Sequence, residues 1–170
     1  MQAVTYHLRR YTVLSDIAGL SGTDVYACGT DGVIVHWDGE RWTRLHSGTR
    51  QHLHAIHCVS DSEVLVCGHH GTILRGSHKT GFKRIPIGNV ETNVWSVRSY
   101  KGAIYVGTES GLRIVSSTGL EQVRLPVEVP YRYAVAALAT AGDALWVVAD
   151  RFVFRLTEND WEVIEHPDNR

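Results

Sequence analysis

The histidines are the residues of this sequence that could most readily bind a metal ion. The chain has 10 of them. His52, His54 and His57 lie in one segment, and His69 and His70 follow shortly after. Imidazole is a common zinc ligand, and three such ligands can hold the ion. On a strand, His52 and His54 share a face whereas His57 points the other way, so this triplet is not a ligand set. His52 could still meet His69 or His70. Polar histidines on a rim are nevertheless the expectation, and no metal site or cofactor is predicted.

Glycoside hydrolysis is a second chemistry to consider, because it needs two carboxyl groups that face each other across a pocket. The charged residues that could surround one face are Asp16, Asp31, Glu91, Glu109 and Asp150, with Arg50, Arg132 and Arg151. The loops that carry them are predicted to be only about two to six residues long, which leaves little chain to build a deep pocket. We therefore predict that the protein is not an enzyme.

The cysteines, the charge and the hydropathy restrict the class of protein further. No Gly-x-Ser-x-Gly segment is present, and Cys28 and Cys67 occupy equivalent positions on strands, as buried apolar residues do. The odd number of cysteines, 3, argues against a disulfide framework. The first residues lack the apolar segment of a signal peptide, and no apolar run approaches the roughly 18 to 20 residues that cross a membrane. The net charge of -1 gives no general attraction for nucleic acid. We expect a cytoplasmic protein that binds neither nucleic acid nor membranes.

A repeat of about 40 residues must position all of these side chains. Its clearest markers are Gly29, Gly68 and Gly107, which are 39 residues apart, and Ala149, which follows after 42. Each marker ends a largely apolar second strand. A first strand and a polar turn precede it, and a tight turn, a third strand and a fourth strand follow. Glycines such as Gly32, Gly71 and Gly111 suit the tight turn because they adopt positive φ without steric cost. A period of about 40 residues built from short strands is typical of propeller blades.

The predicted fold is therefore all-β, a β-propeller of four four-stranded blades per chain. It is either a small closed ring or half of a larger ring completed by a second chain. One domain is expected over residues 1–170, with blades at about 15–48, 53–88, 93–126 and 133–167. Residues 1–14 are predicted to form an extra outer strand, because the sequence at 10–14 matches the fourth strand at 41–45. Since open edges are avoided, this strand should pair with something. It could pair along an edge of the fourth blade, cover the outside of the fold, or reach into a partner chain, as in a homodimer through edge strands.

One stretch carries a resemblance to known repeats. Residues 29–42 read Gly-Thr-Asp-Gly-Val-Ile-Val-His-Trp-Asp-Gly-Glu-Arg-Trp. They resemble the sialidase-like and photosystem II assembly factor-like group of propeller repeats, and the resemblance extends from Ser15 to about Pro167. The sialidase Asp-box, Ser-x-Asp-x-Gly-x-x-Trp, is intact in no blade, and residues 38–42 are a shortened relative of it. The motif is structural in that group, so the resemblance implies the fold and no activity.

The rim of the propeller is the expected binding surface. The connections that enter the first strands and those between second and third strands lie on one face of such a fold. The predicted partner-binding residues there are Asp31, Arg50, His52, His69, His70, Glu91, Glu109, Tyr131, Arg132, Asp150 and Arg151. Mixed charges with tyrosine and histidine suit protein recognition. We predict a non-enzymatic protein-binding module, either an immunity protein that neutralises a toxin or effector or an assembly factor. A glycan- or small-ligand-binding propeller and a sialidase-like hydrolase are the alternatives.

Overall fold

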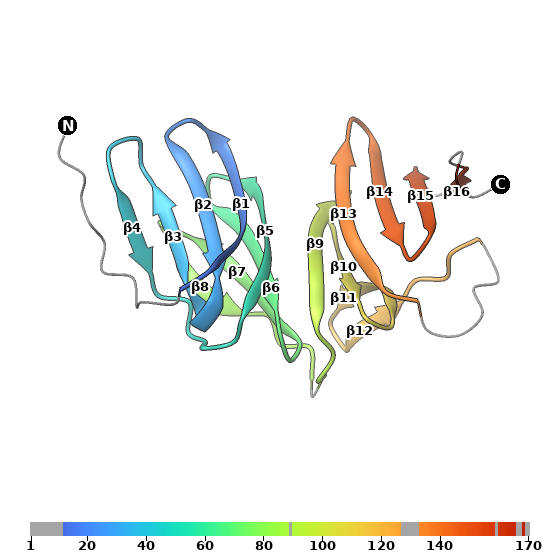
Figure 1. Ribbon diagram of the computed structural model, residues 1–170, viewed down its shortest axis with the longest axis horizontal. Helices are drawn as coiled ribbons and strands as arrows, with labels where there is room; N and C mark the ends of the chain where they lie inside the picture. Colours follow the sequence, from blue (N-terminus) through green and yellow to red (C-terminus); the bar gives the residue numbers. More distant parts are fainter. Residues whose placement is uncertain (1–11, 89, 127–132, 159, 166–167, 169–170) are drawn as a thin grey trace. The chain divides into compact units, whose positions relative to one another are not determined.

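The chain consists almost entirely of antiparallel strands (Figure 1). The computed structural model describes residues 12–88, 90–126, 133–158, 160–165 and 168. The chain divides into two compact units, residues 1–85 (unit 1) and 86–170 (unit 2), and each contains two four-stranded sheets. The helical segment between β2 and β3 is one 3-10 turn, Thr30–Gly32. The predicted all-β architecture of four four-stranded blades is confirmed.

Unit 1 contains sheets 1 and 2, in which the strands follow one another in chain order. Sheet 1 is built from β1 (Leu14–Ser21), β2 (Asp24–Gly29), β3 (Ile34–Trp37) and β4 (Trp42–Leu45). Sheet 2 is built from β5 (Leu53–Ser60), β6 (Glu63–Gly68), β7 (Thr72–Ser77) and β8 (Gly81–Arg84).

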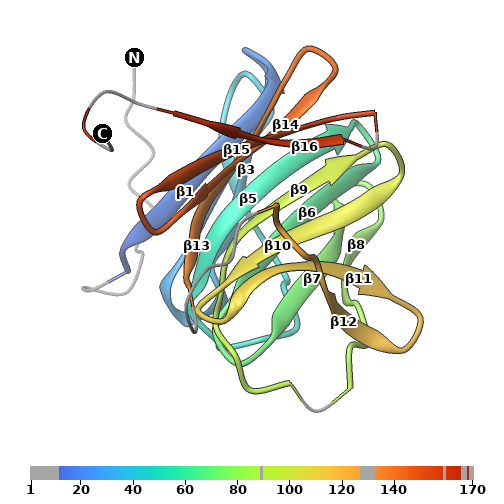
Figure 2. The same cartoon turned by 90° about the vertical axis from the view of Figure 1, so that its right-hand side faces the viewer.

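Unit 2 contains sheets 3 and 4, which repeat this arrangement (Figure 2). Sheet 3 is built from β9 (Val94–Tyr100), β10 (Ala103–Thr108), β11 (Gly111–Ser116) and β12 (Gly119–Gln122). Sheet 4 is built from β13 (Val135–Ala141), β14 (Ala144–Ala149), β15 (Phe152–Thr157) and β16 (Asp160–Ile164).

The turns alternate between the two ends of every sheet, because strands adjacent in sequence pair antiparallel. We call the entry end the one at which the chain enters the first strand and turns from the second strand to the third. In unit 1 those turns have two consecutive residues with positive φ. They are Asp31 (55°) with Gly32 (66°), and His70 (51°) with Gly71 (60°). The predicted glycine turns are therefore present at both positions.

The core of unit 1 lies between its two sheets. Apolar side chains of both sheets meet there: Tyr26, Cys28 and Ile34 from sheet 1, and Leu53, Ile56, Val64, Val66, Leu74 and Phe82 from sheet 2. Asp16 also joins the sheets, since its carboxylate accepts hydrogen bonds from the Ile56 N–H (2.9 Å) and the Ile17 N–H (2.8 Å). Asp16, a candidate catalytic carboxylate in the sequence, is thus a structural acceptor. In unit 2 the corresponding core includes Tyr100 and Phe154.

Each first strand contains a β-bulge near its start. The register skips one residue there while the second strand continues without a gap. The residues left out are Ser15, His54, Trp95 and Ala136, one in each sheet. A bulge bends the strand locally and turns its extra side chain away from the regular alternation. Four unrelated side chains therefore occupy one structural position of the repeat.

The predicted outer strand at the start of the chain is described only in part. Thr12 and Val13 precede β1 without strand structure, and Leu14 is already part of β1. The remainder of the predicted outer strand at 1–14 lies outside the described residues, so it stays a prediction. Within the described residues, no helix combines the length and apolar character needed to span a membrane.

Candidate functional site

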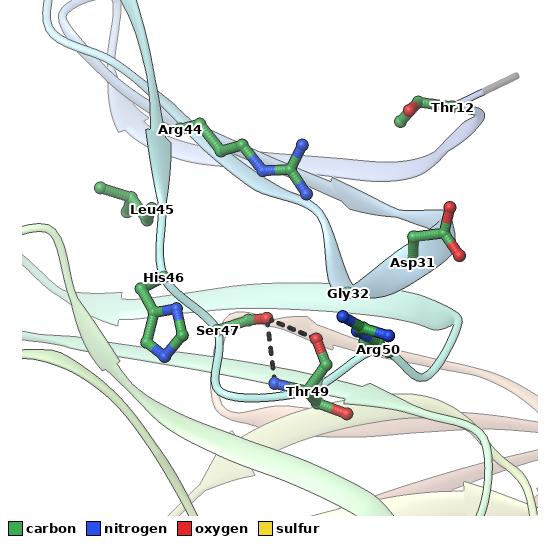
Figure 3. Close-up of a pocket in the computed structure, with 9 residues that line it drawn as sticks. All are labelled: Thr12, Asp31, Gly32, Arg44, Leu45, His46, Ser47, Thr49 and Arg50. Carbon is green, nitrogen blue, oxygen red and sulfur yellow. Dashed lines mark hydrogen bonds between the residues drawn. The ribbon is translucent and has the colours of Figure 1, made fainter. Parts of the chain in front are cut away.

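Two of the predicted partner-binding residues, Asp31 and Arg50, line the same pocket at the entry end of unit 1 (Figure 3). The pocket has a volume of about 460 Å³, and its other lining residues are Thr12, Gly32, Arg44, Leu45, His46, Ser47 and Thr49. Arg44 and Arg50 give it two exposed guanidinium groups against one exposed carboxylate, that of Asp31. The pocket therefore suits a partner group that carries negative charge.

The loop that brings Arg50 to this pocket is fixed by its own hydrogen bonds. Ser47 Oγ donates to the Thr49 carbonyl (3.2 Å) and accepts from the Thr49 N–H (3.4 Å). Gly32 packs so closely against the Thr49 carbonyl that a Cβ there would collide with it. These contacts place the loop beside the β2–β3 turn, so Arg50 and Asp31 are held next to one another before any partner binds.

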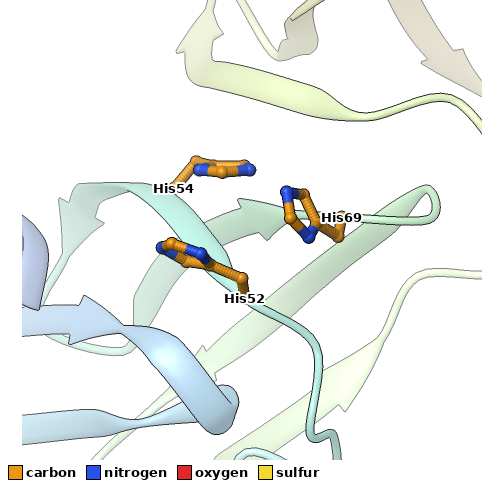
Figure 4. Close-up of side chains that lie close together, drawn as sticks. All are labelled: His52, His54 and His69. Atoms are coloured by element: carbon orange, nitrogen blue, oxygen red, sulfur yellow. The ribbon is translucent and has the colours of Figure 1, made fainter. Parts of the chain in front are cut away.

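Three histidines converge at the same end of sheet 2 (Figure 4). His52 enters β5, His54 is the bulge residue of β5, and His69 follows β6. Their ring centroids lie 4.6 Å (His52–His54), 5.3 Å (His52–His69) and 4.5 Å (His54–His69) apart. All three side chains are half-buried. The meeting of His52 with His69 agrees with the sequence analysis, which did not include His54.

Two rings of this cluster, those of His54 and His69, favour the neutral form. Burial, with the neighbouring His52 and His69, lowers the pKa of His54 to about 4. The pKa of His69 is lowered as well, first by burial and then by His52 and His70. Neutral imidazoles keep a nitrogen lone pair, which can accept a hydrogen bond or bind a metal ion.

His70 is the exposed tip of the β6–β7 turn. Its carbonyl accepts a hydrogen bond from Arg84 Nη2 (2.9 Å), and the same nitrogen donates to the Gly71 carbonyl (3.3 Å). Arg84 of β8 therefore supports the turn, and the His70 side chain is presented on a well-anchored backbone.

In unit 2 the predicted residues Glu91 and Glu109 line a second pocket, of about 490 Å³. The other residues lining it are Thr92, Ser110, Arg113, Gln122 and Tyr133. Thr92 Oγ1 donates to Glu109 Oε1 over 3.4 Å. Burial raises the pKa of Tyr133, whose hydroxyl is hydrogen bonded to Gln122. Two carboxylates, a guanidinium and an aromatic face are thus brought together, and they can contact a polar ligand.

The remaining predicted residues lie on the β14–β15 turn or outside the described chain. Asp150 has a φ of 52°, and its N–H donates to the Ala134 carbonyl over 3.0 Å. The Arg151 guanidinium lies 5.3 Å from the centre of the Phe152 ring. Tyr131 and Arg132 fall outside the described residues, and their predicted role stays a prediction.

Sequence reasoning missed His54, Arg44, His46 and Tyr133 as members of these sites. His54 was treated as a regular strand residue, and a bulge cannot be read from alternation alone. Arg44 and His46 come from the end of β4 and the residue after it, which approach Arg50 only because the following loop folds back. The available signal for the histidine cluster was the number of histidines in the segments around β5 and β6, and these residues lie at the entry end of sheet 2.

No family model matches the sequence. The chain is 32% identical over 149 residues to a protein named immune protein Tsi7, from Pseudomonas aeruginosa, and the match covers 88% of this chain and 48% of Tsi7. The chain thus spans about half the length of this curated relative.

Two solved structures identify the fold. The WD40 β-propeller domain of Doa1 matches with a TM-score of 0.63 at 14% identity, over 91% of this chain and 53% of that one. YCF48 from Cyanidioschyzon merolae matches with a TM-score of 0.66 at 16% identity, over 94% and 59%. Identities this low speak to the fold alone. The predicted resemblance is confirmed at that level: the chain has the fold of the β-propeller-type repeat proteins.

Proposed function

We propose that this protein is an immunity protein, a binding module that neutralises a protein toxin. The observation that carries the proposal is the 32% identity to immune protein Tsi7 over 88% of the chain. That match spans both units, so it does not depend on one shared turn motif. Tsi7 is about twice as long, and the role, the toxin and the complex remain proposals for this chain.

The entry end of unit 1 is the proposed contact surface. It combines Arg44, Arg50 and Asp31 around one pocket with the half-buried His52 and His69 beside it. The supporting turns are short and internally hydrogen bonded, so little conformational entropy is lost when a partner binds. Two arginines beside one aspartate favour an acidic side chain of the partner, and such charge pairs accelerate association.

The cysteines support two further parts of the proposal. Their chemistry favours a binding role over catalysis, and their lack of disulfides favours a reducing compartment. Burial, with the Asp16 charge, raises the pKa of the Cys28 thiol to about 12, and burial with Asp24 raises that of Cys58 to about 11. A thiol with so high a pKa is a poor nucleophile at neutral pH. No disulfide joins the three cysteines, as is usual in the cytoplasm. We therefore also propose a cytoplasmic location and no enzymatic activity.

The test is co-expression with the toxin encoded by the neighbouring gene. The wild-type chain should restore growth and co-purify with the toxin. Arg50→Glu should weaken the complex at least about tenfold, because it places a like charge opposite the acidic group expected on the partner. The matched control is Lys83→Glu, an exposed residue of β8 that lines a separate pocket with Ser62 and Thr80.

The immunity role and the contact surface are tested by different outcomes. If the wild-type chain gives neither protection nor a complex, the immunity role is wrong. If the wild-type chain protects but Lys83→Glu weakens the complex and Arg50→Glu does not, the role stands and the contact surface lies elsewhere.

A glycan- or small-ligand-binding role rests on one specific observation, the pocket of Glu91, Glu109 and Tyr133 in unit 2. A tyrosine face packs well on a sugar ring, and two carboxylates can accept its hydroxyl groups. The hydrolase alternative also requires these carboxyl groups to lie about 5 to 10 Å apart. A glycan array and an assay with a fluorogenic sialoside separate the two, since only a hydrolase releases the fluorophore, and Glu109→Gln should abolish that release.

A further inference from the structure

We propose that His52, His54 and His69 bind a divalent transition-metal ion, with Zn²⁺ as the probe of choice. All three residues belong to unit 1, where they lie at the start of β5 and the end of β6. The inference is independent of the immunity role. It also departs from the expectation drawn from the sequence, which assigned no metal ligand.

The distances between the rings fit one ion. One ligand nitrogen from each ring can be chosen so that all three lie within 4.8 Å of one another. Two nitrogens on a tetrahedral zinc are about 3.4 Å apart, since Zn–N bonds are about 2.0 to 2.1 Å long, and bound rings place their centroids about 5 Å apart. The observed centroid separations of 4.5 to 5.3 Å bracket that value. Small side-chain rotations would therefore complete the ligand set.

The backbone holds the three residues in this arrangement. The His69 N–H donates to the His52 carbonyl over 2.9 Å, which ties the end of β6 to the start of β5. Gly68 permits this approach, because a Cβ at that position would overlap the same carbonyl. His54, the bulge residue of β5, lies with its ring beside the other two (Figure 4). The cluster is thus built on strand ends and does not depend on a long loop.

His52 also has a contact that suits a metal ligand. Its Nε2 lies 2.8 Å from Ser15 Oγ of sheet 1. When Nε2–H donates to this hydroxyl, the tautomer is fixed and the lone pair is on Nδ1, the nitrogen that would bind the ion. A metal-ligating histidine commonly donates its other ring N–H in this way. Sheet 1 therefore supplies an orienting group for a ligand on sheet 2.

The repeat itself does not require histidine at these positions. The equivalent residues are Val13, Ser15 and Thr30 in sheet 1, Asn93, Trp95 and Glu109 in sheet 3, and Ala134, Ala136 and Asp150 in sheet 4. All four sheets form the same bulged first strand with these different side chains. Packing and turn formation therefore do not explain why sheet 2 places three imidazoles together.

Another group of potential ligands, Asp24, His36 and His78, is explained without a metal ion. His36 Nε2 lies 2.9 Å from Asp24 Oδ1, and His78 Nδ1 lies 2.6 Å from the Tyr26 hydroxyl. The His36 and His78 rings stack with their centroids 4.1 Å apart. These side chains form a hydrogen-bonded contact between sheets 1 and 2, whereas the His52, His54 and His69 rings converge with no carboxylate among them.

Three protein ligands leave the fourth position of a tetrahedral ion open. Water, or a side chain of a bound partner, could occupy that position. Since the cluster lies at the entry end, the ion would join the start of β5 to the β6–β7 turn and would stiffen the proposed contact surface.

The test is zinc titration of the full chain after removal of metals with a chelator. We expect one equivalent of Zn²⁺ to bind, and Co²⁺ to give the intense visible absorption of a tetrahedral site. His54→Gln and His69→Gln should each lower zinc affinity at least about tenfold, because each removes one of three ligands. His57→Gln, which changes a histidine of the same strand outside the cluster, should bind zinc like the wild-type chain.

Circular dichroism of the metal-free variants shows whether they fold. A measurement on the wild-type chain does not depend on the variants. Zinc should shift the ring ¹⁵N resonances of His52, His54 and His69 and leave those of His57 unchanged. The proposal is overturned if the wild-type chain shows no saturable zinc binding, if folded His54→Gln and His69→Gln bind as tightly as wild type, or if zinc shifts other histidine rings only.

Discussion

At the scale of single residues, Asp38 illustrates how the shortened Asp-box motif works. Its Oδ1 accepts the N–H groups of Arg41 (2.8 Å) and Glu40 (2.9 Å) in the turn between β3 and β4. These hydrogen bonds, that of Arg41 first, hold the pKa of the Asp38 carboxyl below its ordinary value. The carboxylate is a structural acceptor, as the resemblance to the sialidase-like repeats implied.

We predict that Asp38→Ala lowers the denaturant midpoint of unfolding at pH 7. The folded pKa lies below the unfolded value of 3.8, so the ionised carboxylate stabilises the fold above pH 3.8. This contribution is lost as the pH falls through the folded pKa, and the wild-type and variant midpoints should converge there. Chemical unfolding at a series of pH values measures both effects.

Glu40→Ala is the control for this turn, because Glu40 contributes its N–H to Asp38 and keeps that group when its side chain is removed. It should unfold like the wild-type chain. Equal midpoints for Asp38→Ala and wild type at pH 7 would contradict the structural role.

At the scale of elements, the close approach of β5 to the end of β6 is the contact that organises sheet 2. Gly68 pairs with Leu53, and a Cβ on Gly68 would overlap the His52 carbonyl and crowd the Leu53 Cα. Gly29 makes the corresponding approach to Val13 and Leu14 in sheet 1. In sheets 1 and 2 the glycine that marks the repeat is therefore required by the spacing of two backbones.

We predict that Gly68→Ala destabilises the fold by about 3 kcal/mol, since backbone atoms must move to admit the methyl group. Gly22→Ala is the matched control, because a Cβ there meets no atom within 4 Å and no left-handed φ is required. Its free energy of unfolding should stay within about 0.5 kcal/mol of wild type. Equal losses in the two variants would show that the close approach does not limit stability.

At the scale of the whole molecule, the number of chains that form one propeller can be measured. The chain spans 48% of Tsi7 and 53% of the Doa1 chain, and it supplies four blades. On β1, the first strand of unit 1, Leu14, Ile17 and Leu20 are 47%, 63% and 45% exposed. An exposed apolar strand of this kind is usually covered by another surface.

We predict that the chain is a homodimer in solution, with about twice the 19.0 kDa mass of one chain. Light scattering after gel filtration measures that mass. Ile17→Asp should restore the 19.0 kDa species while leaving the circular dichroism spectrum unchanged, because it places a charge in the covered face. A wild-type mass of 19.0 kDa at all concentrations would contradict the dimer and favour a ring closed within one chain.

The sequence by itself determined the elements of this protein. The recurrence of Gly29, Gly68 and Gly107 indicated the blade, and alternating apolar residues placed first strands near Leu53 and Val94, where β5 and β9 begin. Its odd number of cysteines also argued against a disulfide framework, and no disulfide joins them. These properties depend on local patterns: side-chain alternation along a strand and the backbone freedom of glycine in turns.

Only the tertiary structure decided which side chains of different elements meet. Asp16 looked like a candidate catalytic carboxylate until the packing of sheet 1 on sheet 2 paired it with the Ile56 N–H. Alternation placed His54 on the same face as His52, but it showed neither the bulge of β5 at His54 nor the approach of His69 from the end of β6. A bulge depends on how two strands pair, and a contact between sheets depends on how they pack. Neither is encoded in the spacing of residues along one strand.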